Sequence, residues 1–220
     1  MATKKTAKKE VTKASIITAF MDHVLTKEEM PKSIYKFCKE QKITETDFYQ
    51  HFSSFQHLQE EIWVAFYEHS WELINKDNNF DSYDNENKML VFLYTFFEVL
   101  TANRSYVLYV LPQNKKELQK LSQLKHLRIR IKLFAKELIE NRNENAKTPL
   151  GERSPKIYAE GAWLQVLFLM NYWRNDRSPS FEKTDIAIEK SVRAIFDVFD
   201  TSPFQSVLDL GKFLWKEQNI

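Results

Sequence analysis

The sequence predicts an all-helical fold. Only three glycines and six prolines occur among its 220 residues, as expected for long helices joined by few tight turns. Apolar residues recur every three to four positions in successive segments, which places them on one face of a helix. The chain is long enough to bury a core, and its 17 phenylalanines indicate that this core is roomy and lined by aromatic side chains.

The first helix is expected over residues 12–26, after a lysine-rich stretch, residues 1–10, that should be a disordered basic arm. Its apolar face consists of Ile16, Ile17, Phe20, Met21, Val24 and Leu25. A second helix begins near Pro31, which suits a first helical turn because the missing N–H has no partner to lose there. Its apolar face consists of Ile34, Phe37 and Cys38.

A third, short helix follows the break at Gln41-Lys42-Ile43. Thr44 is a good N-cap for it, with Asp47 as an acidic partner three residues later. Phe48 and Phe52 then face one way. The second and third helices predict a helix–turn–helix, the usual device for laying a short helix in a DNA groove. A fourth helix should run from about residue 54 to residue 75.

The remaining helices are expected beyond a polar stretch, residues 75–87, that marks the edge of the N-terminal domain. They cover residues 86–101, 103–111, 114–143, 156–174, 182–200 and 203–218. The helix at 156–174 is apolar on nearly all sides and should be buried on all of them, either by a partner subunit or by an intrachain core. The residues predicted at a dimer interface are Trp163, Leu167, Met170, Trp173, Val192, Ile195, Phe196 and Phe199.

Over residues 11 to 62, the N-terminal helix, the helix–turn–helix and the Phe-Tyr-x-x-Phe element before the fourth helix resemble the TetR family of transcription regulators. The matching residues are Ile16, Ala19, Phe20, Ile34, Ile43, Phe48, Tyr49, His51, Phe52 and Leu58. The resemblance implies a homodimeric repressor with a DNA-binding domain at 11–58 and a ligand-binding and dimerisation domain at 76–220. The DNA contacts expected on this basis are Lys32, Lys42, Thr44, Thr46, Tyr49, Gln50 and His51. For His51, a capping or surface role is the alternative.

Two positions depart from the family pattern. The family usually has a glycine in the turn, where a positive φ is easiest, whereas this chain has Gln41-Lys42. The family usually has Ser-Lys-Glu after the Phe-Tyr element, with the lysine on a phosphate, whereas this chain has Ser54-Phe55-Gln56. One expected phosphate contact is therefore missing.

Charge is distributed unevenly along the chain. Residues 1–13 contain five lysines and one glutamate, a net charge of +4, whereas residues 14–58 contain five lysines and six acidic residues, a net charge of −1. Because phosphate contacts supply most non-specific affinity for DNA, the arm should carry the favourable charge. It either follows the DNA backbone or minor groove, or is a solvated tail.

The sequence contains no motif typical of an enzyme. One cysteine, Cys38, and five scattered histidines offer neither a disulfide nor metal-ligand spacing. There is no glycine-rich phosphate loop and no nucleophile elbow, so we expect no enzymatic activity and no cofactor. No apolar run approaches the roughly 20 residues of a membrane span and no signal peptide is visible, which predicts a cytoplasmic protein.

Aromatic residues predict a small-ligand site, since pockets between bundle helices are mostly apolar with a few polar groups. Simple core packing is the alternative for each of them. The predicted ligand-binding residues are Trp63, Phe66, Tyr67, Trp71, Phe92, Phe96, Tyr106, Tyr109, Phe134 and Trp163.

The C-terminus supports a second interpretation. Residues 203–218 form an amphipathic segment ending near a tryptophan, which could lie on a membrane surface or cap its own bundle. This segment, and the pattern Asp-x-Ser-x-x-Phe-x-x-Thr at 176–184, are similar to TetR-fold lipid-binding accessory proteins of ubiquinone biosynthesis. That resemblance implies a lipid or isoprenoid in the aromatic core and no DNA binding. A protein–protein adaptor without a ligand is the third interpretation.

Overall fold

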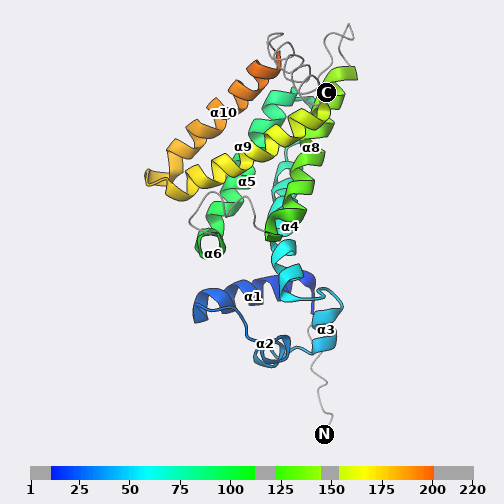
Figure 1. Ribbon diagram of the computed structural model, residues 1–220, viewed down its shortest axis with the longest axis vertical. Coiled ribbons are helices and arrows are strands. Elements are labelled where there is room, and N and C mark those ends of the chain that lie inside the picture. Colours follow the sequence, from blue (N-terminus) through cyan, green and yellow to red (C-terminus); the bar gives the residue numbers. More distant parts are fainter. Residues whose placement is uncertain (1–10, 112–121, 145–153, 201–220) are drawn as a thin grey trace, which may run out of the picture. The chain divides into compact units, whose positions relative to one another are not determined.

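The computed structural model describes residues 11–111, 122–144 and 154–200, and every regular element in these ranges is helical (Figure 1). The predicted all-helical fold is confirmed. The α-helices are α1 (Lys13–Lys27), α2 (Ile34–Gln41), α3 (Glu45–Tyr49), α4 (Phe55–Ile74), α5 (Asn85–Ala102), α6 (Arg104–Val110), α8 (Lys125–Glu144), α9 (Pro155–Asn175) and α10 (Glu182–Asp200). Short 3-10 turns occur at η1 (Phe80–Ser82), η2 (Ser122–Leu124) and η4 (Pro179–Phe181).

The chain forms two compact units. The first contains the described residues of Met1–Ala65 and Ala102–His126, and the second those of Phe66–Thr101 and Leu127–Ile220. The division therefore falls inside α4 and inside α8, whereas the sequence placed the domain edge in the polar stretch after α4. The functional domain limits stay a prediction. The basic arm and the amphipathic C-terminal segment lie outside the described residues.

Local capping explains where the helices of the first unit begin. The Thr12 hydroxyl accepts a hydrogen bond from Ser15 N at the start of α1, and the Ser33 hydroxyl accepts one from Lys36 N at the start of α2. At α3, Thr44 and Asp47 form the reciprocal pair expected of a capping box: Thr44 Oγ1 accepts from Asp47 N, and Asp47 Oδ2 accepts from Thr44 N. The predicted cap of the third helix is confirmed.

The turn between α2 and α3 keeps a left-handed residue although it has no glycine. Lys42 adopts φ 57° and ψ 34°, and its backbone N–H donates back to the end of α2. A left-handed conformation costs a residue with a Cβ atom roughly 1–2 kcal/mol. The hydrogen bond from Ile43 N to Cys38 O, 3.0 Å, helps to hold the turn. The helix–turn–helix therefore tolerates the missing glycine at an energetic cost.

The second departure from the family pattern, Phe55, is explained by packing. Its ring lies 5.6 Å from that of Phe20 and 5.7 Å from those of Phe37 and Phe48, measured between centroids. Phe20, Phe37 and Phe48 are fully buried, so Phe55 completes an aromatic core beneath the helix–turn–helix. Aromatic pairs of this kind contribute about 0.5–1.5 kcal/mol each beyond the area they bury. At the position where the family resemblance leads us to expect a cation for phosphate, this chain has a half-buried phenylalanine that packs on core aromatics.

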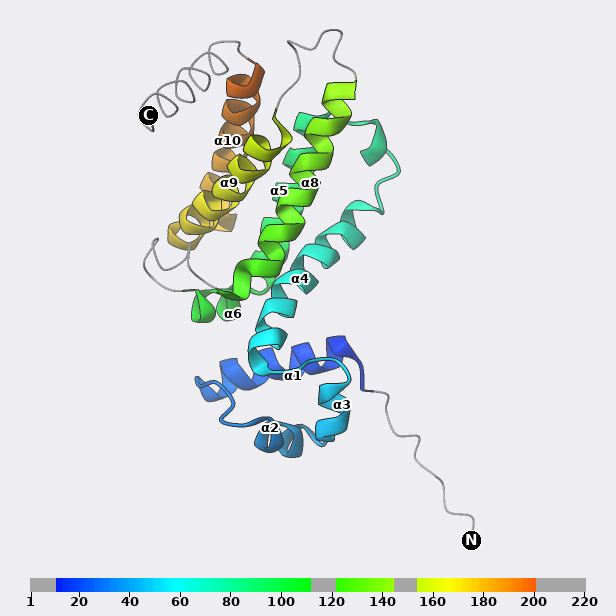
Figure 2. The ribbon, with the colours of Figure 1, turned by 45° about the vertical axis from the view of Figure 1, so that its right-hand side comes forward.

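In the second unit, α9 and α10 lie side by side and run in opposite directions (Figures 1 and 2). The connection between them is fixed by Asp176, which is 7% exposed. Its Oδ1 accepts hydrogen bonds from Ser178 N (2.8 Å) and Ser178 Oγ (2.6 Å), and its Oδ2 accepts from Thr184 N (2.8 Å) and Thr184 Oγ1 (2.7 Å). The Asp-x-Ser-x-x-Phe-x-x-Thr pattern is therefore a cap that anchors the first turn of α10 to the end of α9.

Candidate nucleic-acid interface and effector pocket

The short helix α3 presents a polar face to solvent on an aromatic base. Phe48, on its inner side, is fully buried, whereas Tyr49 on the outer side is 53% exposed. Thr44, Thr46 and Gln50 are exposed as well. Thr46, Tyr49 and Gln50 can donate and accept hydrogen bonds, which is the chemistry needed to read base edges, whereas the Thr44 hydroxyl donates its hydrogen to Asp47 Oδ2.

Three further predicted DNA contacts lie around α3. Lys42, in the turn, and Lys32, before α2, are exposed, and the Lys32 ammonium lies 3.9 Å from a Glu29 carboxylate oxygen. His51 is half-buried, and its Nε2 lies 3.2 Å from the carbonyl oxygen of Val11. Since a carbonyl can only accept, Nε2 is the donor, and His51 ties the end of α3 to the residues before α1. This contact favours the structural alternative for His51.

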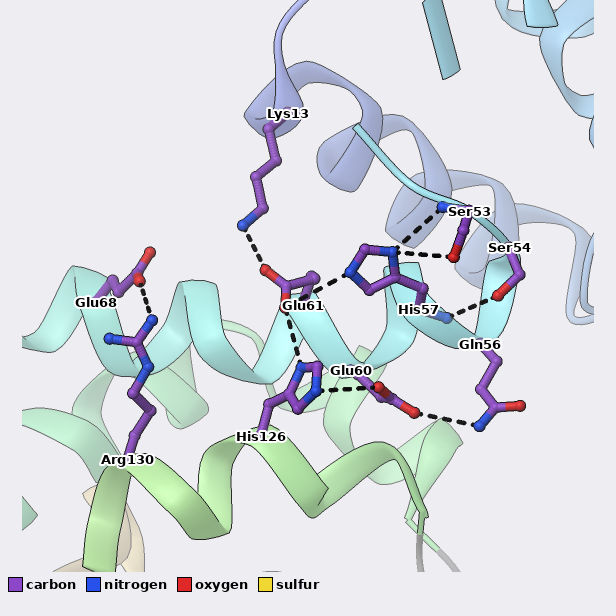
Figure 3. Close-up of polar contacts among 10 residues, drawn as sticks. All are labelled: Lys13, Ser53, Ser54, Gln56, His57, Glu60, Glu61, Glu68, His126 and Arg130. Atoms are coloured by element: carbon purple, nitrogen blue, oxygen red, sulfur yellow. Dashed lines mark hydrogen bonds and ion pairs between the residues drawn. The ribbon is translucent and has the colours of Figure 1, made fainter. Parts of the chain in front are cut away.

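A polar network connects three helices of the same unit at Glu61 (Figure 3). One carboxylate oxygen of Glu61 pairs with the Lys13 ammonium of α1. The other lies 3.1 Å from Nδ1 of His126 in the first turn of α8, and 3.9 Å from Nε2 of His57 on α4. The second ring nitrogen of His126 lies 3.6 Å from Glu60. Burial raises the pKa of Glu61, but its hydrogen bonds and the surrounding cations outweigh burial and lower it.

Sequence reasoning did not find this network, because Glu61 and His126 are 65 residues apart in the chain. The Glu61 side chain is only 16% exposed, so its ion pairs are partly shielded from water. Such a carboxylate can hold α1 and the start of α8 in register with α4.

The predicted ligand-binding aromatics are divided between the two units. Three belong to the first unit. Trp63 is buried and donates from Nε1 to Gln123 Oε1 at 3.2 Å. Tyr109 is 42% exposed and donates to the Glu28 carbonyl at 2.7 Å, at the end of α1. Tyr106 is buried, its hydroxyl has no hydrogen-bond partner among the described residues, and burial raises its pKa.

The other seven belong to the second unit, and four of them are joined around Trp71. Its ring stacks on Phe92 at 5.6 Å and meets Phe134 edge-on at 5.0 Å and Tyr67 at 6.2 Å. Phe92 is fully buried and stacks in turn on Phe96, so these two form the floor of the cluster. Phe66 and Trp163 are buried and do not line the pocket described next.

A cavity of about 420 Å³ opens over this cluster. Tyr67, Trp71 and Phe134 are the predicted ligand residues that line it, between the end of α4 and α8. Its complete lining is Tyr67, Trp71, Asn75, Phe80, Asp81, Lys88, Arg130, Leu133, Phe134, Glu137, Leu138 and Asn141. Arg130 donates to Glu68 at 3.2 Å (Figure 3), which links α8 to α4 beside the cavity. An aromatic wall with a polar rim suits a ring-bearing or amphipathic small molecule.

Most residues predicted at a dimer interface are already buried inside the chain. Of that set, Trp163, Leu167, Met170, Trp173, Val192 and Phe196 are buried, Ile195 is half-buried, and the side chain of Phe199 lies outside the described part. The outer side of α9 instead exposes Leu164 (58%), Phe168 (44%) and Tyr172 (37%). These three follow one another at intervals of four residues, and Ile186 on α10 is 50% exposed. These four exposed side chains are not in the predicted set, and the predicted dimer interface stays a prediction.

Two features are absent from the described ranges. No helix there is long and apolar enough to cross a membrane. No group of three or more His, Cys, Asp or Glu side chains there could hold a metal ion.

Comparison with known proteins identifies the C-terminal part of the chain. The family model described as "Tetracyclin repressor-like, C-terminal domain" matches residues 88–214, more than half of the sequence. No curated protein and no solved structure gives a significant match. The matched span begins beyond residues 11 to 62, on which the sequence resemblance rested, so the two observations are independent. The chain belongs to the tetracyclin repressor-like (TetR) family of regulators.

Proposed function

We propose that this protein is a ligand-responsive transcription regulator, acting as a repressor, that binds operator DNA as a homodimer. The observation that carries the proposal is the exposed polar face of α3, which a capping box and a buried aromatic core hold in place. Thr44, Thr46, Tyr49 and Gln50 would contact base edges in the major groove. Lys32 and Lys42 would contact phosphates and fix the register of the helix.

The basic arm would supply most of the electrostatic affinity. Lys13 is paired with Glu61 and so is already engaged. The remaining cations of the arm are Lys4, Lys5, Lys8 and Lys9. Each phosphate that these lysines neutralise releases counterions, which makes binding steeply dependent on salt.

Dimerisation would use the exposed stripe on α9, defined as Leu164, Phe168 and Tyr172, together with Ile186 of α10. In a two-fold dimer the same stripe meets itself, so its apolar side chains bury one another. Such an interface would present two copies of α3, which must lie about 34–36 Å apart to enter successive major grooves.

The ligand would bind in the cavity over Trp71, between α4 and α8. A ligand that fits one spacing of these helices better than another shifts the equilibrium between conformations by its difference in affinity. Since α4 begins directly after the helix–turn–helix, a change in its position would alter the spacing of the two copies of α3. Operator release is then the expected response.

A lipid- or isoprenoid-binding accessory protein on the same fold is the second candidate. Phe55 favours it, because the position at which the family carries a phosphate-binding lysine is occupied by a core aromatic. The net charge of −1 over residues 14–58 also favours it. Lipid extracted from the purified protein, with liposome binding that is lost on truncation after Pro203, would support this candidate.

The test of the first candidate is binding to duplex DNA from upstream of the protein's own gene, measured by fluorescence anisotropy. Tyr49→Ala and Gln50→Ala should weaken specific binding about ten-fold or more each, the range for a lost base contact. Tyr35→Ala is the matched control, because Tyr35 is 59% exposed but lies on α2. Equal affinity of all variants for this DNA would contradict the proposal that α3 contacts its bases.

A further inference from the structure

The first turn of α3 carries two carboxylates in different situations. The Asp47 carboxylate is engaged, because its Oδ2 accepts from Thr44 N at 2.9 Å and from Thr44 Oγ1 at 2.7 Å. Glu45, the first residue of α3, is exposed. Within the described part of the chain, no hydrogen bond or ion pair holds its carboxylate. Glu45 is therefore a free anion on the helix proposed to enter DNA.

The rest of the exposed face of α3 has no compensating cation. Its other members are uncharged: Thr44, Thr46, Tyr49 and Gln50. The commonest specific contact to DNA, an arginine or lysine on guanine O6 and N7, is not available from this helix. Among the exposed residues described here for α3 and its caps, Glu45 is thus the only one with a formal charge.

A free carboxylate in the major groove can discriminate between bases in two ways: it weakens binding to most sequences, and it accepts a hydrogen bond from a suitable base. It loses water and approaches phosphates of its own sign, which is unfavourable against most sequences. Only a base-edge donor offsets that cost. Cytosine presents its N4 amino group, whereas guanine presents the acceptors O6 and N7, and thymine the acceptor O4. Adenine has an N6 donor, but its N7 acceptor lies beside it.

We propose that Glu45 is a specificity-determining residue that accepts a hydrogen bond from a cytosine N4 amino group, so that each operator half-site contains a required C·G pair. This inference rests on the proposed function, in which α3 reads DNA. It adds a residue that sequence reasoning left out, and it names the base class that this residue selects.

Glu45→Gln is the informative substitution. Glutamine keeps the shape of the side chain but adds an amide donor, and it pairs bidentately with adenine N6 and N7. The variant should therefore lose its discrimination in favour of cytosine and accept adenine at that position. Its affinity for DNA of unrelated sequence should rise, because one repulsive charge is gone.

The experiment is a selection from a random duplex library with the full-length protein, its Glu45→Gln variant and Asp22→Asn. Asp22 is exposed on α1, so its substitution removes one negative charge from the same unit without altering α3. We expect the parent protein and Asp22→Asn to enrich the same half-site, with cytosine at one position. Replacing that cytosine should weaken the parent about ten-fold, the middle of the range for one base contact.

Three results would overturn the inference. Enrichment of the same bases by Glu45→Gln and by the parent protein would show that Glu45 does not contribute to base discrimination. A uniform gain in affinity, equal to that of Asp22→Asn, would show that Glu45 acts only through its charge. If the parent protein enriches no sequence, the proposed DNA-binding function itself fails, and the role of Glu45 fails with it. Thermal unfolding of Glu45→Gln, monitored by circular dichroism, confirms that the variant is folded.

Discussion

Replacing Asp176 by asparagine should destabilise the second unit strongly, although the two side chains have nearly the same shape. Asparagine keeps one carbonyl oxygen, which can serve either Ser178 or Thr184. The NH2 group of asparagine then takes the place of a carboxylate oxygen. Because it is a donor, it cannot accept the two hydrogen bonds that this oxygen accepts. Thr184 is 1% exposed, so water cannot replace the lost partner there.

The magnitude follows from the number and kind of hydrogen bonds. Asp176 accepts four, at 2.6 to 2.8 Å, and two of them come from the buried Thr184. Hydrogen bonds to a charged group contribute about 1.5–3 kcal/mol each, so losing either the Ser178 pair or the Thr184 pair should cost about 3 kcal/mol. If the chain of 220 residues unfolds as one cooperative unit, that loss lowers the melting temperature by about 6–12 °C.

The assay is urea and thermal denaturation followed by circular dichroism, comparing Asp176→Asn with Thr184→Val and Asp197→Asn. Thr184→Val removes only the hydroxyl donor and should cost about 1.5 kcal/mol, half of the loss expected for the pair. Asp197 is exposed on the same helix, α10, and serves as the matched control with little expected effect. If Asp176→Asn unfolds like Asp197→Asn, the carboxylate does not fix the junction and the reasoning is refuted.

The effect should also depend on pH. Burial raises the pKa of Asp176, but the hydrogen bonds from Ser178 and Thr184 outweigh burial and lower the pKa from 3.8 to about 2. Because the pKa in the folded state is the lower one, the stabilisation is complete above 3.8 and is lost as the pH falls toward 2. The difference in stability between the parent protein and Asp176→Asn should therefore narrow over that interval. A difference in stability that stays constant over this pH interval would contradict a stabilising role of the charged Asp176 carboxylate.

Three further predictions concern oligomeric state, ligand binding and the polar network. If the protein forms the proposed dimer, Phe168→Glu should convert it to a monomer of unchanged helicity, as measured by light scattering and circular dichroism; a dimer that persists would exclude the exposed stripe as its interface. Trp71→Ala should abolish the quenching of tryptophan fluorescence by amphipathic ring compounds while leaving operator preference intact. If the variant still shows this quenching, the ligand does not bind in the cavity over Trp71. Glu61→Gln should lower the free energy of unfolding by about 1 kcal/mol, the upper range for partly exposed ion pairs; hydrogen exchange at the start of α1 should rise with it, and unchanged exchange would argue against a role in holding Lys13.

Local signals made the N-terminal fold predictable. The Thr44 cap and its Asp47 partner lie three residues apart, and Phe48 and Phe52 lie four apart, so each feature can be recognised without knowledge of the rest of the chain. The left-handed turn was harder to predict from the sequence, because Lys42 adopts a positive φ, which is most easily adopted by glycine.

Long-range contacts explain what the sequence did not reveal. Phe55 lies where the resemblance leads us to expect a cation, and only the structure shows that its ring packs on the buried rings of Phe20 and Phe48. The partnership of Glu61 with His126 joins helices far apart in the chain. On α9, periodicity identified an apolar helix, but it did not separate the buried Leu167 from the exposed Phe168, because nearly every position of the helix is apolar.

The most direct test of the central claim is the binding of the full-length protein to its own upstream DNA across a salt series, compared with a form lacking residues 1–10. The deletion stops there because Thr12 caps α1 and Lys13 pairs with Glu61. We predict specific binding with a steep salt dependence, and a slope of log K against log salt reduced by up to about 7 when the four arm lysines of each of the two subunits are lost. Binding that never exceeds the level of unrelated DNA, with the same slope for both forms, would contradict the account of a DNA-binding regulator.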